Sequence, residues 1–206
     1  KKYDDYAGID VAQRLSPQID KIPEEIIATP LLVGLVYRSF ATTNSISDRL
    51  TGFYADTFTA LYEGHDLTKA GFERVKESKL AEDEFLYLLR AFAFLSIAQN
   101  KLSWADESEV CDYIRKSQNI CPVDCSPSTF CRDLLKAVPI LIKDGSEIKI
   151  VHKKFQEYFA ADYIKNIPDS INSLNSIYNG PSRNLFTKVV EFLYEMAPVL
   201  VRGVIL

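Results

Sequence analysis

Apolar residues recur at spacings of three and four along most of this chain, which is the period of an amphipathic α-helix. The longest such pattern runs from Glu82 to Asn100 and is apolar on most of its circumference, as a helix at the centre of a domain must be. Shorter helical patterns run from Ser47 to Tyr62, from Trp104 to Ser117 and from Ser126 to Val138. These patterns predict a mainly α protein.

Prolines in the N-terminal part of the chain predict where helices end and begin. Pro17 should shorten or break a helix between Gly8 and Asp20, because proline lacks the amide hydrogen that a helix interior needs. Pro23 and Pro30 stand where two helical segments could begin, since the fixed φ of proline suits a first helical turn. The polar run 41–48 then separates two apolar patterns and predicts a domain boundary.

Residues 139–151 change to alternation, which is the period of a β-strand. Asp144-Gly145 lies between two β-prone arms, and this dipeptide is the strongest short-range signal for a hairpin. Helices followed by such a hairpin describe a winged-helix unit, and helical spacing returns from Asn172 to Leu206. We therefore predict a helical bundle, a winged-helix domain with one small β-hairpin, and then further helices.

The stretch from Ile148 to Tyr163 joins the second arm of this hairpin to an aromatic-rich helix. His152 lies at the junction, which places its imidazole at a helix N-terminus where exposed backbone N–H groups favour anions. Phe155, Tyr158 and Phe159 recur at helical spacing and should form an apolar stripe. A phosphate group could therefore bind beside His152, although the residues alone favour a structural role for this histidine.

Composition and charge narrow the possible functions. The chain has 206 residues, a net charge of −4 and an isoelectric point near 5.3, a balance that argues against a main task on nucleic acid or an anionic membrane. The longest apolar segment, Phe85 to Ala98, contains Arg90 and is shorter than the ~20 residues that a bilayer span needs. Because no initiating Met or signal peptide is seen, we expect a cytoplasmic protein and a part of a longer chain.

Four cysteines lie close together in the sequence: Cys111, Cys121, Cys125 and Cys131. They form no C-x-x-C pair, and His152 lies far downstream of them. We therefore predict free thiols in a reducing compartment and no metal site.

Four stretches of the chain resemble a known family. Ile150-Val-His-Lys-Lys-Phe-Gln-Glu-Tyr-Phe-Ala-Ala161 closely resembles the end of the winged-helix domain in NACHT proteins, which are signal-transducing NTPases of the STAND class. That class includes NOD-like receptors and bacterial antiphage proteins. Ala28-Thr-Pro-Leu-Leu-Val-Gly-Leu-Val36 is similar to the family's helical domain, and Asp48-Arg-Leu-Thr-Gly-Phe-Tyr54 with Gly64-His-Asp66 to its linker helix. The resemblance covers most of residues 1–165.

The resemblance implies a shared site for ADP or ATP. By it, His152 contacts the β-phosphate of bound ADP and Pro30 packs on the adenine, with no metal held by this part of the protein. Family members often carry an aromatic residue two positions before the histidine, where this chain has Ile150. That departure should affect packing more than the phosphate contact.

The sequence contains no G-x-x-x-x-G-K-[ST] motif, so the loop that cradles a triphosphate is missing from it. We therefore expect that this stretch is not itself an enzyme, and that an upstream NTPase core of the same protein could be an ATPase. The resemblance implies a helical domain at 1–44, a winged-helix domain at 45–166 and a further helical subdomain or repeat at 167–206. The expected role is a defence or signalling switch that closes over ADP and opens to homo-oligomerise.

Two alternatives stay open at this point. In a winged-helix DNA-binding regulator, Thr129 to Val138 would be the recognition helix, but Arg132 and Lys136 there are offset by Asp133, which leaves few cations for phosphate contacts. In a helical adaptor without a nucleotide, His152 would have no task. The coding sequence before Lys1 distinguishes all three possibilities.

Overall fold

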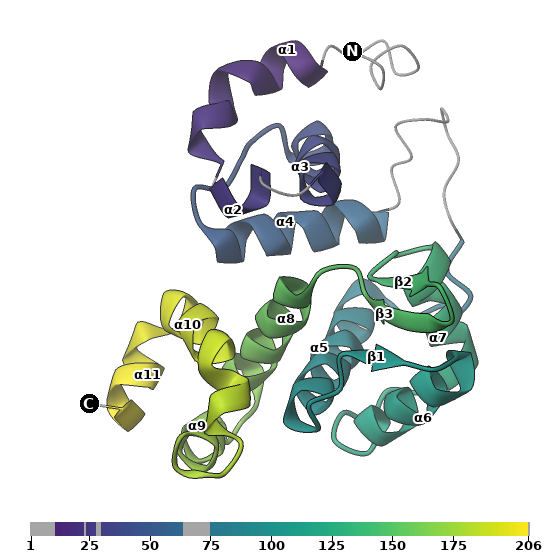
Figure 1. The fold of residues 1–206 in the computed structure, drawn as a ribbon, viewed down its shortest axis with the longest axis vertical. Helices are drawn as coiled ribbons and strands as arrows, with labels where there is room; N and C mark the ends of the chain where they lie inside the picture. Colours follow the sequence, from purple (N-terminus) through teal and green to yellow (C-terminus); the bar gives the residue numbers. More distant parts are fainter. Residues whose placement is uncertain (1–10, 23, 28–29, 64–74, 206) are drawn as a thin grey trace. The chain divides into compact units, whose positions relative to one another are not determined.

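The structure is a computed structural model of the chain, and it describes residues 11–22, 24–27, 30–63 and 75–205. The chain divides into two compact units, residues 1–75 and residues 76–206 (Figure 1). The described residues are mainly helical and include a small three-stranded antiparallel sheet. The predicted fold class, mainly α with one small hairpin, is confirmed.

The first unit is a helical bundle. Its elements are α1 (Val11–Leu15), the 3-10 helix η2 (Ser16–Lys21), α2 (Glu24–Ile27), α3 (Pro30–Thr43) and α4 (Leu50–Glu63). Pro17 stands in the first turn of η2, where the helical path changes as predicted. The apolar residues of α3 and α4 with helical spacing are buried: Leu32, Val36, Phe40, Phe53, Phe58 and Leu61. The boundary predicted between residues 44 and 45 falls inside this unit, between α3 and α4, which contact each other.

The second unit begins with helices and strands in the order of a winged helix. These elements are α5 (Glu82–Ala98), β1 (Ser103–Trp104), α6 (Glu107–Gln118), α7 (Pro127–Lys136), β2 (Leu141–Asp144) and β3 (Glu147–Ile150). The sheet has the strand order β1-β3-β2, with β3 antiparallel to both neighbours. Asp144 pairs with Glu147, and Gly145 between them has φ +62°, a left-handed conformation that glycine adopts without strain. The predicted hairpin is therefore present.

The strand β1 was not predicted from the sequence. We expected Trp104 to begin a helix, but Trp104 pairs with Ile148 in the sheet and the helix begins three residues later, at Glu107. Asp106 is the N-cap of that helix, because its carboxylate accepts the N–H of Glu109 at 2.9 Å. The Trp104 ring is fully buried and stacks on Phe92. The helical prediction for Trp104 was wrong because packing of this ring decides the local conformation.

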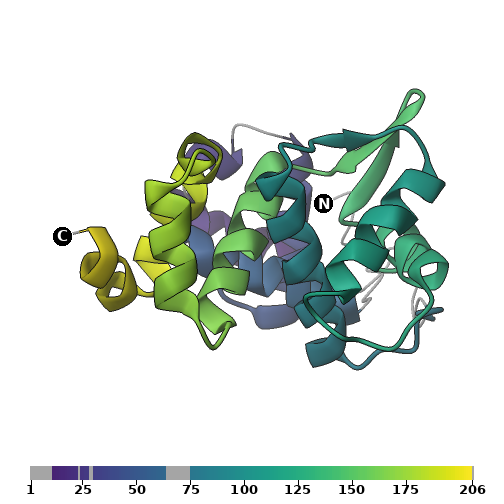
Figure 2. The same ribbon diagram turned by 90° about the horizontal axis from the view of Figure 1, so that it is seen from below.

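Helices complete the second unit. They are α8 (Lys153–Asn166), α9 (Ser170–Asn179), the 3-10 helix η3 (Arg183–Phe186), α10 (Thr187–Met196) and α11 (Pro198–Ile205). Figure 1 shows α8 between α5 on one side and α10 on the other, and α8 contacts both helices. Figure 2 shows α8, in green, beside the teal α5 from below. Ala160 and Ala161 are fully buried on α8, and such small side chains let neighbouring helices approach closely. The core of this unit is therefore built around α8.

A buried ion pair fixes α8 against α5. Arg90, the charge that interrupts the long apolar segment, donates from Nε to Asp162 Oδ2 at 2.6 Å. Asp162 is only 5% exposed, and Asn166 Nδ2 also donates to its other carboxylate oxygen at 2.9 Å. The second half of α8 is therefore anchored independently of its first turn.

No helix within the ranges given above is both long enough and apolar enough to cross a membrane.

Candidate functional site

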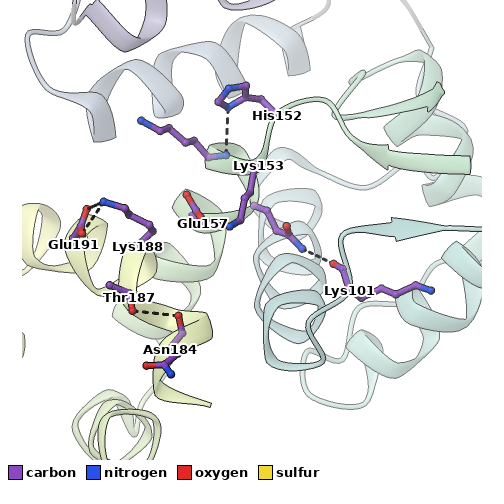
Figure 3. Close-up of polar contacts among 10 residues, drawn as sticks. Lys101, His152, Lys153, Glu157, Asn184, Thr187, Lys188 and Glu191 are labelled. Atoms are coloured by element: carbon purple, nitrogen blue, oxygen red, sulfur yellow. Dashed lines mark hydrogen bonds and ion pairs between the residues drawn. The ribbon is translucent and has the colours of Figure 1, made fainter. Parts of the chain in front are cut away.

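The candidate site is the start of α8, where the chain leaves β3. Val151 N–H donates to Ile140 O at 2.8 Å and so fixes the end of the hairpin. His152 follows in an extended conformation, with φ −155° and ψ 133°, as the N-cap of α8. Its Nδ1 accepts the N–H of Lys154 at 3.3 Å (Figure 3). The predicted position of His152 between strand and helix is confirmed.

The hydrogen bond at Nδ1 determines the chemistry of the ring. A neutral imidazole has one donor and one acceptor nitrogen, so a ring that accepts at Nδ1 carries its proton on Nε2. Burial lowers the pKa of His152 from its usual 6.5, and the nearby Glu157 carboxylate opposes this change. At pH 7 the ring is therefore neutral and offers an Nε2–H donor.

The first turn of α8 has an unusual charge pattern. It contains no acidic residue, and its first two positions are Lys153 and Lys154. Burial lowers the pKa of Lys154, and the nearby Glu157 carboxylate opposes this change. The positive end of the helix dipole ordinarily carries acidic residues, so two lysines there leave a local excess of positive charge.

Glu157 is the carboxylate closest to this turn along α8. Its side chain is 7% exposed, and Lys153 Nζ lies 3.4 Å from its Oε1. Figure 3 shows this pair beneath the start of α8, together with the exposed Lys188–Glu191 pair of α10. A single long contact to an exposed lysine screens Glu157 only partly, so Glu157 also influences the charge on His152. Sequence spacing of four residues on a helix could have identified the Lys153–Glu157 pair.

Further contacts hold this part of α8 in place. Gln156 is buried, and its Nε2 donates to Lys101 O at 3.0 Å, which links α8 to the turn after α5 (Figure 3). On α10, Thr187 Oγ1 donates to Asn184 O at 3.2 Å. The His152 backbone is therefore held by a sheet on one side and a packed helix on the other.

The start of α6 provides a contrast within the same unit. Asp106 caps this helix, and Glu107 and Glu109 lie in its first turn. A cavity of about 440 Å³ beside it is lined by Asp106, Glu107, Lys143 and Glu147, among others, and Lys143 pairs with Glu107 at 2.8 Å. Carboxylates outnumber cations there, so an anion is disfavoured at this helix start.

The other predicted contact, Pro30, is the first residue of α3. Its side chain lies outside the described residues. Because Pro30 belongs to residues 1–75 and His152 to residues 76–206, a shared site between them stays a prediction. The Gly64-His-Asp66 motif also lies outside the described residues.

The four cysteines are free thiols, with Cys121 and Cys131 buried and the other two half-buried. Burial raises the pKa of Cys121 and Cys131 to about 12 and that of Cys125 to about 11, so thiolates are scarce at neutral pH. Among the residues that the structure describes, no cluster of three His, Cys, Asp or Glu side chains could hold a metal ion.

The charged side chains of α7 and the wing are paired within the fold. Asp133, which the sequence sets against Arg132 and Lys136, is buried, with 2% exposure, and it accepts backbone N–H groups of Glu77 and Ser78. Surface cations of α7 and the wing are engaged by other carboxylates; these ion pairs are Arg132–Glu77, Lys143–Glu107 and Lys149–Asp144.

Comparisons with known proteins add no assignment. The chain matches no protein-family model and no curated protein. The resemblance to NACHT proteins therefore stays a prediction that rests on the motifs around Pro30 and His152.

Proposed function

We propose that this chain is the regulatory part, helical plus winged-helix, of a NACHT-type STAND NTPase, and that His152 holds the β-phosphate of ADP in the inactive state. The observation that carries the proposal is the start of α8. There a neutral imidazole with its proton on Nε2 caps a helix whose first turn is cationic and lacks acidic residues. This arrangement presents a hydrogen-bond donor, a helix dipole and a cationic first turn to an anion, and one of the two lysines of that turn, Lys153, also pairs with Glu157.

The energy available from this arrangement suits a switch. A hydrogen bond from His152 Nε2 to a charged phosphate oxygen contributes about 1.5–3 kcal/mol where water is excluded. A difference of that size between two conformations changes their ratio by about 10- to 150-fold. His152 can therefore bias a closed state strongly without taking part in bond breaking.

In this proposal, nucleotide chemistry belongs to an NTPase core that precedes Lys1 in the parent protein. The helical unit contributes Pro30 to the adenine side of the nucleotide and the winged-helix unit contributes His152 to its phosphate side. The closed arrangement persists while both contacts are made, and exchange of ADP for ATP releases His152 and favours an open, oligomerising form. The output would be signalling or defence.

Nucleotide content of the parent protein tests the proposal. The protein is expressed with its natural upstream sequence, purified and denatured, and the released nucleotide is quantified by chromatography. We expect near-stoichiometric ADP in the wild type and substantially less in His152→Ala. A coding sequence without a P-loop before Lys1, or equal ADP content in the two proteins, would contradict the proposal.

The winged-helix topology itself favours a second candidate, a DNA-binding regulator. Its affinity would depend on cations of α7 and the wing, where Arg132, Lys143 and Lys149 are paired with carboxylates. We therefore expect no measurable binding of duplex DNA by the 206-residue chain in fluorescence anisotropy at 50 mM salt. Salt-dependent binding that Lys143→Ala weakens would favour this candidate instead.

A further inference from the structure

Asp133 makes an unusual pair of contacts at the point where the chain enters the second unit. Its Oδ1 accepts the N–H of Glu77 at 2.8 Å and its Oδ2 accepts the N–H of Ser78 at 2.9 Å. The residues are more than fifty positions apart in the sequence, and Asp133 is only 2% exposed. One buried carboxylate on α7 thus binds two consecutive backbone amides of the entering segment.

The two amides form a small anion-binding turn. Successive backbone N–H groups in a turn point into a common concavity that favours negative charge. Glu77 and Ser78 lie in such a turn, and Lys79 after them has φ +56°, the left-handed conformation. Asp133 supplies the negative charge from within the protein, and both of its oxygens are used.

Other contacts fix the segment on either side of the turn. Arg132 Nη1 lies 2.6 Å from Glu77 Oε2, in an exposed ion pair. Leu80 is buried, with 7% exposure, and the N–H of Ala81 donates to Glu84 Oε2 at 3.2 Å at the start of α5. The segment 76–81 contains no helix or strand, so these contacts define its path.

We propose that Asp133 is a positioning residue for the linker between the two units. By binding the Glu77 and Ser78 amides, it makes residues 76–80 part of the rigid body of the second unit. If the orientation between the units changes, the backbone of residues 76–80 therefore keeps its conformation. The chain then always enters the second unit in the same direction. This proposal concerns the linker alone and does not depend on nucleotide binding.

The charge on Asp133 is what the proposal requires. Asn at this position keeps the size of the side chain but offers one acceptor oxygen, and its amide group is a donor that cannot bind a second N–H. Arg132→Gln is the matched control, because it removes the side-chain ion pair with Glu77 and leaves the carboxylate in place. The two neighbouring variants therefore separate backbone binding from surface charge.

Amide hydrogen exchange, measured by NMR on the 206-residue chain, tests the proposal. In Asp133→Asn we expect the Glu77 and Ser78 amides to exchange about tenfold faster or more, with the α5 amides of Leu88 and Leu89 unchanged. Trypsin cleavage after Lys79 should accelerate in parallel, whereas Arg132→Gln should change either rate less than about threefold.

Two results of these experiments would overturn the proposal. Unchanged exchange at Glu77 and Ser78 would show that the carboxylate does not hold them, and equal acceleration in α5 would show that Asp133 only stabilises the whole unit. If Asp133→Asn does not fold, a measurement on the wild-type chain tests the proposal instead. Through-hydrogen-bond couplings from the Asp133 carboxylate carbon to the two amide nitrogens are expected, and their absence, with helix couplings visible, would overturn the proposal.

Discussion

The starts of α6 and α8 are two helix N-termini of one folded unit that are treated in opposite ways. At α6, the cap is the Asp106 carboxylate, and two further acidic residues follow in the first turn. At α8, the cap is the His152 imidazole, and two lysines follow. The positive end of α6 is therefore neutralised by its own sequence, and the positive end of α8 is not.

The acidic first turn of α6 follows a general rule of helix stability, and the first turn of α8 departs from it. Acidic first turns stabilise a helix wherever it lies, and α5 follows the same rule with Glu82, Asp83 and Glu84. A helix whose first turn lacks acidic residues is less stable, and departures of this kind are concentrated at functional sites. The start of α6 is explained by folding alone, whereas the start of α8 is the place where we propose that an anion binds.

The largest expected effect tests whether α8 is held independently of its start. Arg90→Leu removes the partner of Asp162 and, within the part of the chain that the structure describes, leaves a buried carboxylate with only Asn166 as a side-chain donor, so the free energy of unfolding should fall by about 3 kcal/mol. Chemical denaturation measures it. Lys165→Ala, an exposed position on the same helix, serves as the control.

A fall of less than about 1 kcal/mol in Arg90→Leu would mean that the ion pair does not anchor α8. Substitutions at its start could then displace the whole helix, and the comparison with α6 would lose its meaning.

The two caps should differ in strength. Asp106→Ala removes a 2.9 Å hydrogen bond to a carboxylate, so the chain should lose about 1 kcal/mol of stability. His152→Ala removes a longer bond, 3.3 Å, to an imidazole, and should lose about 0.5 kcal/mol. Thermal unfolding of the nucleotide-free chain compares the two variants. A greater loss in His152→Ala would show that His152 is chiefly a structural cap.

The burial of His152 should be visible in how the stability of the chain depends on pH. Because the folded pKa lies below the unfolded value, the unfolded chain binds more protons, and stability from the neutral ring is present above pH 6.5 and is lost as pH falls toward the folded pKa. NMR titration of the imidazole C–H signals measures the folded pKa directly. The chain has only two histidines, so His65→Gln assigns the signals. A midpoint above 6.5 would contradict the account.

The smallest expected effect is the change in stability when one charge is removed from the first turn of α6 or of α8. This change should have opposite signs in the two helices. Lys154→Gln should raise the stability of the chain by about 0.5 kcal/mol, because burial and the helix dipole both disfavour its charge. Glu107→Gln should lower stability by a similar amount, about 0.5 kcal/mol, because the dipole and Lys143 favour its charge. Denaturant midpoints of the two variants should shift in opposite directions, and shifts in the same direction would remove the contrast.

Local patterns in the sequence predicted much of this fold. The helical period from Glu82 to Asn100 anticipated α5, and Asp144-Gly145 anticipated the hairpin, because both signals lie within a few residues of the structure they specify. His152 was placed correctly between a strand and a helix for the same reason. By contrast, β1 is only two residues long and pairs with a strand more than forty positions away, so no local period identifies it.

The contacts of Asp133 and Arg90 were beyond the reach of the sequence for a related reason. Each depends on a partner more than fifty residues away, and only the folded chain brings the partners together. Asp133 on an amphipathic helix is more easily explained as a surface charge, and its burial follows from the path of residues 76–80. For the candidate site, the sequence predicted which residue lies at the helix start but not the tautomer of its ring, which the Lys154 N–H determines.

The rate of ADP release from the parent protein, with its upstream core, tests the central claim about His152 most directly. His152→Asn keeps a capping side chain but lacks a donor at the Nε2 position, whereas His152→Gln can place an amide N–H there. We expect ADP release to be about tenfold faster or more in His152→Asn, with His152→Gln closer to the wild type and the cap control Asp106→Asn unchanged. Release from His152→Asn at the wild-type rate would contradict the account.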